Sequence, residues 1–334
     1  MAIILDAMGS DKYPDPEIEG SVLAVRVVKE PIILVGDKVV LEKKLNDLSP
    51  DHPNISIEHA PEVVDMWDKP VESAQKKPDN SMAVGVNLVK TGKGQAFVTA
   101  GNTGGAMFNA LRVLGRIKGV QRPALSAIFP TRKGQCIVVD IGANADCRPD
   151  FLVQFGIMGS IYAQNVLGVN NPRIGLLSNG EEAGKGNQLI KDSYKLFEES
   201  GLNFYGNIEP KELFFGEADV VVTDGFTGNV LVKSSEAVAK LITDVLKEEL
   251  MRSFRTKIGA LLAKPAFSKI RNLIDPSEVG AAPLLGIDGL VFVGHGRSDA
   301  KAIVSSLMLA EKAINTNLMK ELKEKISESL SQAA

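Results

Sequence analysis

Loops rich in glycine, asparagine and aspartate hold the residues of this 334-residue chain that are best suited to chemistry. Six such loops follow short apolar runs, at residues 6–11, 101–105, 140–144, 178–182, 224–229 and 294–299. A glycine-rich turn lets backbone N–H groups approach an anion closely, and a helix that follows adds free N–H groups and the positive end of its dipole. The loops therefore predict a site for a small anion, with phosphate or a phosphate ester as the leading candidate.

Neutral donors and a few charged side chains in or near these loops are the candidate site residues. The candidates for substrate binding are Asp6, Gly9, Ser10, Gly101, Thr103, Gly104, Ser178, Asn179, Gly180, Thr227, Arg297 and Ser298. The candidates for catalysis are Asn102, Asn144, Lys185, Asp224, Asn229 and His295. Any one loop is also explained as a turn, and Thr227 and Ser298 as helix caps. Six loops at strand ends favour a ligand site, because parallel α/β sheets bind ligands at the carboxyl ends of their strands.

The motifs of several common enzyme classes are missing from the sequence. No GxGxxG follows the first apolar run, which argues against a standard dinucleotide-binding turn. Residues 180–185 are one residue short of a P-loop, and Ser178 lacks the flanking glycines of a nucleophile elbow. Cys136 and Cys147 have neither a CxxC partner nor a nearby histidine, which favours structural thiols over a zinc site or a catalytic thiol.

Two further interpretations concern charged residues at the ends of the apolar runs. Asp6, Asp140 and Asp224 could together bind a metal, although helix caps and lysine partners are the favoured roles for them. His295 stands between two glycines, so both a substrate contact and a turn hydrogen bond to the backbone stay open for it. We therefore expect no metal site.

Short apolar runs rich in isoleucine and valine predict strands that are buried on both faces. They cover residues 3–5, 32–35, 96–99, 125–129, 137–139, 174–177, 220–223 and 290–293. Apolar residues at helical spacing predict helices over 17–28, 107–117, 230–250 and 300–314. This alternation predicts an α/β fold with a mostly parallel sheet between two layers of helices. We expect residues 1–334 to form a single α/β catalytic domain, in one body or two lobes.

Composition limits the class of protein and the cellular compartment that we expect for this chain. The formal net charge of −3 gives no general affinity for nucleic acid. The first residues have no basic region, and no stretch reaches the roughly 18 apolar residues that span a bilayer. We expect a cytoplasmic chain.

Residues 251–274 depart from the rest of the chain because they contain six basic residues and no acidic one. Pro265 predicts a turn between two helices, and thus a basic–apolar helical hairpin. The candidates for contact with a membrane or an acidic carrier protein are Arg255, Leu261, Leu262, Lys264 and Phe267. A solvated basic face over a buried stripe and packing within a dimer are the alternatives.

The loops, in their order along nearly the whole chain, resemble one family: bacterial phosphate acyltransferase, which acts on acyl–acyl carrier protein in phospholipid synthesis. The resemblance lies in residues 6–11, 100–105, 140–144, 177–182, 224–229, 280–286 and 294–299. One departure is Gly105, where the family is expected to favour alanine, and both residues are small. The resemblance implies a three-layer α/β/α sandwich like that of the phosphate acetyltransferases and the isocitrate and isopropylmalate dehydrogenases.

The resemblance also implies an activity and partners. The reaction would be reversible transfer of a fatty acyl group from acyl carrier protein to inorganic phosphate, without an organic cofactor. The acyl phosphate would feed phosphatidic acid and phospholipid synthesis through a downstream membrane-bound glycerol-3-phosphate acyltransferase. The enzyme would be a homodimer that associates loosely with the inner face of the membrane.

That reaction suits the residues, because phosphate is itself a nucleophile and a thiol of pKa about 8.5 is a tolerable leaving group. No covalent enzyme nucleophile is then required, so the site has to position the reactants and stabilise the oxyanion. We expect loop 101–105, with Asn102 and Thr103, to cradle phosphate. The remaining expected roles are orientation by Asn144, Asn179 and Asn229, charge compensation by Lys185, and proton transfer to sulfur by His295 or Asp224.

Three alternatives remain at this stage. A phosphate acetyl- or butyryltransferase would use acyl-coenzyme A. A decarboxylating dehydrogenase of the same fold would need NAD and a divalent metal. A non-catalytic phosphate- or lipid-binding scaffold would bind without turnover.

Overall fold

The computed structural model describes residues 2–332, and within them every side chain except those at 74, 271, 272, 274, 276 and 330–332. This part of the chain forms one sheet of eleven strands in the order β3–β2–β1–β4–β11–β10–β5–β6–β9–β7–β8. The strands are β1 (Ala2–Asp6), β2 (Ile32–Gly36), β3 (Ile55–His59), β4 (Gly94–Thr99), β5 (Ala124–Thr131), β6 (Gly134–Val139), β7 (Ile174–Leu177), β8 (Phe204–Ile208), β9 (Val220–Val222), β10 (Ala281–Leu285) and β11 (Leu290–Gly294).

The sheet changes direction at its centre. Strand β10 is antiparallel to both β11 and β5, and β5 is antiparallel to β6, whereas the other pairs are parallel. The strands β6 to β9 therefore run opposite to β1, β2, β3, β4 and β11. The predicted mostly parallel α/β sheet is confirmed, but its strands form two parallel groups of opposite direction.

All eight predicted strands are present, and three strands were not predicted. Strand β10 contains Pro283, which normally argues against a strand inside a sheet. Strands β3 and β8 are the two edges of the sheet, so their residues are less buried and their apolar pattern is weaker.

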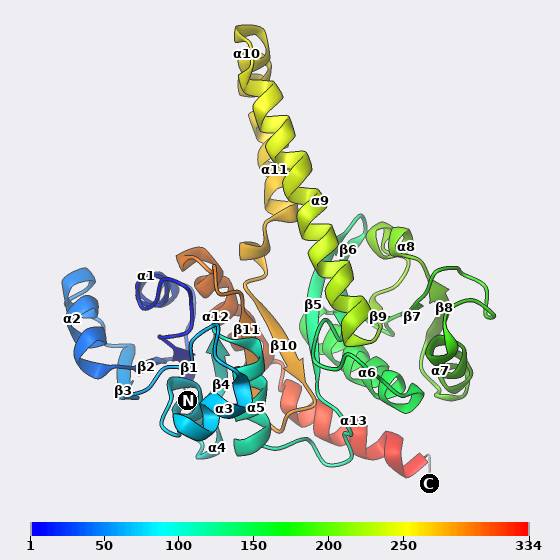
Figure 1. The fold of residues 1–334 in the computed structure, drawn as a ribbon, viewed down its shortest axis with the longest axis horizontal. Coiled ribbons are helices and arrows are strands. Elements are labelled where there is room, and N and C mark those ends of the chain that lie inside the picture. The colour runs from blue at the N-terminus through cyan, green and yellow to red at the C-terminus, as the bar shows by residue number, and fades with distance from the viewer. Residues whose placement is uncertain (1, 333–334) are drawn as a thin grey trace.

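Helices cover both faces of the sheet (Figure 1). They are α1 (Asp15–Ala24), α2 (Lys38–Leu48), α3 (Pro70–Lys76), α4 (Ser81–Lys90), α5 (Thr103–Val113), α6 (Pro149–Tyr162), α7 (Gln188–Glu199), α8 (Pro210–Phe215), α9 (Gly225–Met251), α10 (Phe254–Leu262), α11 (Lys264–Ile274), α12 (Ala300–Asn315) and α13 (Leu318–Gln332). The predicted helices over 230–250 and 300–314 match α9 and α12 closely. The other two predicted helices end about four residues earlier, at Ala24 and Val113.

The core has two layers because neighbouring strand residues point to opposite faces. Ile3 and Leu5 pack in a cluster with α1, α6 and α12, whereas Ile4 packs in another with α4 and α5. In the second group of strands, Val138 packs with α8 and α9 on the face opposite Val139. The predicted three-layer sandwich with two-sided strands is confirmed.

Helix α9 leaves the body as an arm (Figure 1). Its 27 residues span about 40 Å at 1.5 Å per residue. Helix α10 lies at the tip and α11 returns beside α9, so residues 251–274 contain two helices. Pro265 lies in the first turn of α11, where a proline costs no backbone hydrogen bond. None of the helices described within residues 2–332 is both long and apolar enough to cross a bilayer.

Candidate active site

The first group of loops follows β1, β4 and β11. Buried Asp6 accepts a hydrogen bond of 2.7 Å from Thr99 Oγ1, and Thr99 Oγ1 accepts one of 3.0 Å from the Gly101 N–H. A Cβ at Gly9 would lie 2.8 Å from the Gly101 nitrogen, so only glycine lets these loops meet. The predicted residues Asp6, Gly9 and Gly101 therefore lie together, with Thr99 linking Asp6 to Gly101.

A second buried carboxyl supports the same loop from α1. Glu17 Oε1 accepts a hydrogen bond of 3.0 Å from the Ser10 N–H. Burial raises the pKa of Glu17 to about 7 and also raises the pKa of Asp6, because water no longer solvates the charged forms. Within the described residues, Glu17 Oε2 and Ser10 Oγ are buried without a hydrogen-bond partner.

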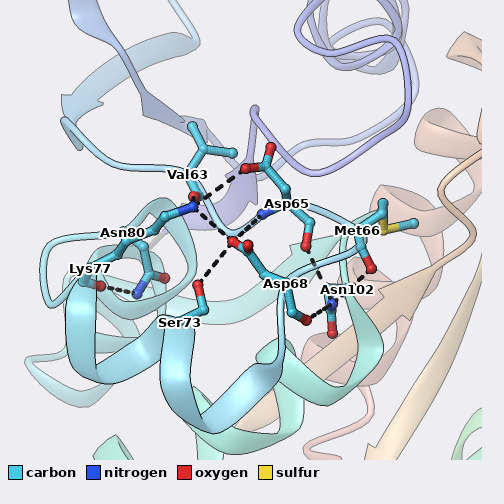
Figure 2. A network of polar contacts seen from close by, with 8 residues as sticks. All are labelled: Val63, Asp65, Met66, Asp68, Ser73, Lys77, Asn80 and Asn102. Carbon is cyan, nitrogen blue, oxygen red and sulfur yellow. Dashed lines mark hydrogen bonds and ion pairs between the residues drawn. The ribbon is translucent and has the colours of Figure 1, made fainter.

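Asn102 caps α5 and also fixes a neighbouring loop. Its Oδ1 accepts from the Gly105 N–H at 2.9 Å, as an N-cap does. Its Nδ2 donates to the carbonyl oxygens of Asp65, Met66 and Asp68 at 3.1–3.3 Å (Figure 2). The side-chain amide is thus fully used in holding structure, which leaves backbone donors for an anion.

Those backbone donors are the first N–H groups of α5. Among the described residues, nothing in the chain accepts from the N–H of Thr103 or Gly104. Unpaired N–H groups at a helix start form an anion site with the helix dipole. Loop 101–105, where a phosphate cradle is predicted, therefore has two available backbone donors, whereas the side-chain amide of Asn102 is already occupied.

The second group of loops follows β6, β7 and β9. Asp140 adopts a positive φ of 69°, and its carboxylate accepts from the N–H groups of Gly142, Ala143 and Asn144 at 2.7–3.2 Å. Asn144 Nδ2 donates to Asp140 Oδ2 and to the Pro123 carbonyl, both at 2.8 Å. Asp140 therefore organises the loop that presents Asn144.

The start of α9 packs directly on that loop. Asp224 caps α9, with Oδ1 accepting from the Thr227 N–H and Oδ2 from the Thr227 hydroxyl, both at 2.8 Å. Asn229 Nδ2 donates to the Ile141 carbonyl at 3.0 Å. A Cβ at Gly228 would lie 2.0 Å from the Asp140 carbonyl oxygen, so this glycine permits the close approach. Asp224, rather than Thr227, is the helix cap.

Residues after β7 line a cavity beside this start of α9. Asn179 Oδ1 accepts from the Gly186 N–H at 2.9 Å, and Lys185 packs on Gly180 with its side chain exposed. Ser178 Oγ is buried and, within the described residues, has no partner. A cavity of about 1670 Å³ begins at Ser178, Asn179, Asp224 and Thr227 and continues along apolar residues of α9 to Phe267 of α11.

Helix α9 contacts the loop after β11 through a residue that sequence analysis did not find. Glu236 lies on α9. Its Oε2 accepts a hydrogen bond of 2.9 Å from Arg297 Nη2, and its Oε1 lies 3.5 Å from His295 Nε2. Ser298 is buried in the same loop, but Asp299 rather than Ser298 caps α12. Nothing in the local sequence marks Glu236, because it is one of several charged residues in a long helix.

The chain is similar to known proteins over nearly its whole length. A family model described as "Fatty acid synthesis protein" matches residues 1–321. The chain is 45% identical to the phosphate acyltransferase of Elusimicrobium minutum and 43% identical to that of Clostridioides difficile, each over 98% of this chain and 96% of the relative. The chain belongs to the phosphate acyltransferase family. It is therefore an acyltransferase whose family transfers acyl groups to phosphate, and the predicted family is confirmed.

More distant solved structures share the fold. A phosphotransacetylase from Streptococcus pyogenes superposes with a TM-score of 0.60 at 17% identity, covering 94% of each chain. A 4-hydroxythreonine-4-phosphate dehydrogenase from Klebsiella pneumoniae gives a TM-score of 0.51 at 15% identity, covering 93% of this chain and 97% of the other. These neighbours confirm the predicted fold class, which the phosphate acyltransferase family shares with phosphotransacetylases and a dehydrogenase.

The thiols of this phosphate acyltransferase family member are poor nucleophiles. Burial raises the pKa of Cys147 to about 12 and that of Cys136 further, so neither is a thiolate at neutral pH. In the described part of the chain, no group of three or more His, Cys, Asp or Glu side chains could hold a metal ion. The polar groups that are present can bind an anion and orient a carbonyl, which is what acyl transfer to phosphate needs.

Proposed function

We propose that the acyl donor is a fatty acyl–acyl carrier protein and that the product is a fatty acyl phosphate. Phosphate oxygen attacks the thioester carbonyl, the carbon–sulfur bond breaks, and the thiol of the carrier protein leaves with a proton. The acyl phosphate then serves phosphatidic acid synthesis by a membrane-bound glycerol-3-phosphate acyltransferase. The observation that carries this proposal is the long apolar cavity that starts at the polar loops, because an aliphatic chain fits its wall.

The proposed roles of the site residues depend on which of their polar groups already make hydrogen bonds within the chain and which remain available. Phosphate would bind at the N–H groups of Thr103 and Gly104, with Lys185 offsetting its charge. The Nδ2 of Asn179 and the hydroxyl of Ser178 are the candidates to bind the carbonyl oxygen, because both lie at the start of the cavity. His295, held near Glu236, is the candidate to protonate sulfur. Asn102, Asn144, Asp224 and Asn229 would position these groups.

Release of free acyl carrier protein from palmitoyl–acyl carrier protein tests this function. We expect release only when phosphate is present, with an acyl phosphate as co-product. Acetyl-coenzyme A serves as the comparison and is expected to react far more slowly. Release without phosphate would show a thioesterase, preference for acetyl-coenzyme A would show an acetyltransferase, and no release would contradict the proposal.

We infer that the exposed apolar residues of the arm pack in a homodimer. Leu241 and Val245 are more than half exposed on α9 and do not line the cavity. Such a stripe on a projecting helix is typical of a helix–helix interface. Sedimentation equilibrium at micromolar concentration should give twice the chain mass of 35.8 kDa, and the monomer mass would contradict the inference.

We further propose that the tip of the arm contacts an anionic membrane. Leu261, Leu262 and Phe254 are each more than two-thirds exposed there, beside Arg255 and Lys264, whose side chains are exposed. Apolar side chains next to basic ones bind anionic lipid surfaces. Phe267 instead lines the cavity, so its candidate role at the membrane rests on the hairpin as a whole.

Vesicle binding tests the tip directly. Changing Leu261→Glu and Leu262→Glu together should reduce co-sedimentation with anionic liposomes at least tenfold, because burial of two leucines is worth about 3 kcal/mol or more. The matched control is Val39→Glu on α2, which is also exposed but lies on the body. Unchanged binding of the double variant would remove these leucines from any membrane role.

A further inference from the structure

The loop between β3 and α3 exposes the chain's single tryptophan. Trp67 is 97% exposed, the largest exposed fraction among the large hydrophobic side chains of the described residues. An indole has one of the largest apolar surfaces of any side chain, so leaving it in water forgoes a large stabilisation. Such a side chain is typical of binding surfaces.

The backbone on both sides of Trp67 is held in place by a polar network (Figure 2). Asn102 Nδ2 donates to the carbonyl oxygens of Asp65, Met66 and Asp68. Lys77 Nζ donates to Asp68 Oδ2 at 2.7 Å, and Ser73 Oγ donates to the same oxygen at 3.0 Å. The hydrogen bond from Lys77 lowers the pKa of Asp68, so the pair is ionised at neutral pH. The loop that carries the indole is therefore held in place by these hydrogen bonds.

The residues that flank Trp67 pack on both parts of the first group of loops. A Cβ at Gly296 would lie 2.0 Å from Met66 Cε, so Met66 covers the loop that carries His295. A Cβ at Gly104 would lie 2.5 Å from Pro70 Cγ, so Pro70 covers the start of α5. Trp67 thus belongs to a loop that touches both the start of α5, which carries the proposed phosphate donors, and the loop of the residue proposed to protonate sulfur.

We propose that Trp67 binds the thiol-bearing arm of the acyl donor. This rests on the proposed function, in which the acyl chain occupies the cavity along α9 and sulfur lies near His295. The arm then has to leave the site from sulfur, past the loop that packs on Gly296. A pantetheine-type arm is a chain of amides and methyl groups, which packs well on the face of an indole.

Tryptophan fluorescence tests the contact without turnover. Because the signal comes from Trp67 alone, titration with carrier protein that bears the thiol arm should shift or quench the emission. Carrier protein without the arm, free palmitate and inorganic phosphate should each leave it unchanged. An equal response to carrier protein without the arm would overturn the assignment to the arm, as would no response to the protein that bears it.

Kinetics give the second measurement. Trp67→Ala should raise the KM for palmitoyl–acyl carrier protein about tenfold, with kcat within about twofold and the KM for phosphate unchanged. Trp67→Phe should retain most of the affinity, and Val39→Ala, at an exposed position on α2, should match the wild type. If wild type turns over but Trp67→Ala keeps the wild-type KM, this inference alone is wrong. If the emission responds but no phosphate-dependent release occurs, the proposed function is wrong instead.

Discussion

At pH 8, Glu17→Gln should raise the free energy of unfolding by about 3 kcal/mol relative to the wild type. Burial raises the pKa of Glu17 from 4.5 to about 7, and each pKa unit corresponds to about 1.4 kcal/mol. Glutamine keeps the oxygen that accepts from the Ser10 N–H, and its NH₂ group can donate to the unpartnered Ser10 hydroxyl. The variant therefore removes a buried charge without removing the hydrogen bond.

The sign of the expected change in the free energy of unfolding follows from the pKa of Glu17 in the folded and unfolded states. The folded carboxyl binds a proton more tightly than the unfolded one, so the stability that it contributes is fully present below about pH 4.5. That contribution is lost as the pH rises to about 7, and it stays lost above. Urea unfolding at pH 4 and pH 8 should show little difference between variant and wild type at pH 4 and the full difference at pH 8. The control Glu19→Gln, exposed on the same helix, should change neither value.

Gly228→Ala should cost about 3 kcal/mol or more and reduce phosphate-dependent turnover about 100-fold. The new Cβ would lie 2.0 Å from the Asp140 carbonyl oxygen and 3.0 Å from the Ile141 Cα, and both are backbone atoms. A rotamer change cannot relieve such a contact, so α9 must move away from loop 140–144. That movement displaces Asn144, Asp224 and the start of the cavity together.

Gly259→Ala is the matched control, because it makes the same change in α10 at a position with nothing within 4 Å. Alanine is the better helix former, so this variant should be as stable as the wild type or more stable by up to about 1 kcal/mol. Thermal unfolding and the phosphate-dependent release assay measure both variants. Wild-type stability and activity in Gly228→Ala would mean that the contact between α9 and loop 140–144 is not tight in solution.

The sequence predicts the sheet well because its strands are buried on both faces. Ile3, Ile4 and Leu5 are all fully buried, so a continuous apolar run is the expected pattern. Strand β10 was not predicted, because Pro283 has no N–H to donate to a neighbouring strand and the pairing of β10 with β5 is distant in sequence. The antiparallel pair of β10 with β5 is a long-range property that no local pattern records, whereas β5–β6 and β10–β11 are hairpins of consecutive strands.

The site is predictable to the level of loops but not of individual atoms. Glycine and asparagine at strand ends identified the loops. The side-chain amide of Asn102, however, donates to the carbonyl oxygens of a loop near residue 66. That loop contains no glycine motif, so nothing in it indicated a place beside α5. Glu236 was missed for a related reason, because its pairing with Arg297 spans 61 residues.

The order of strands in the sheet also sets an order of events during synthesis. Strands β4 and β5 are consecutive in the chain, but β11 and β10 lie between them in the sheet. The two halves of the sheet therefore keep open edges until residues 281–294 have left the ribosome. Such late, non-local pairing is slow and leaves unpaired strand edges that other chains can bind. The nascent chain is consequently most exposed to aggregation just before its last sixth is made.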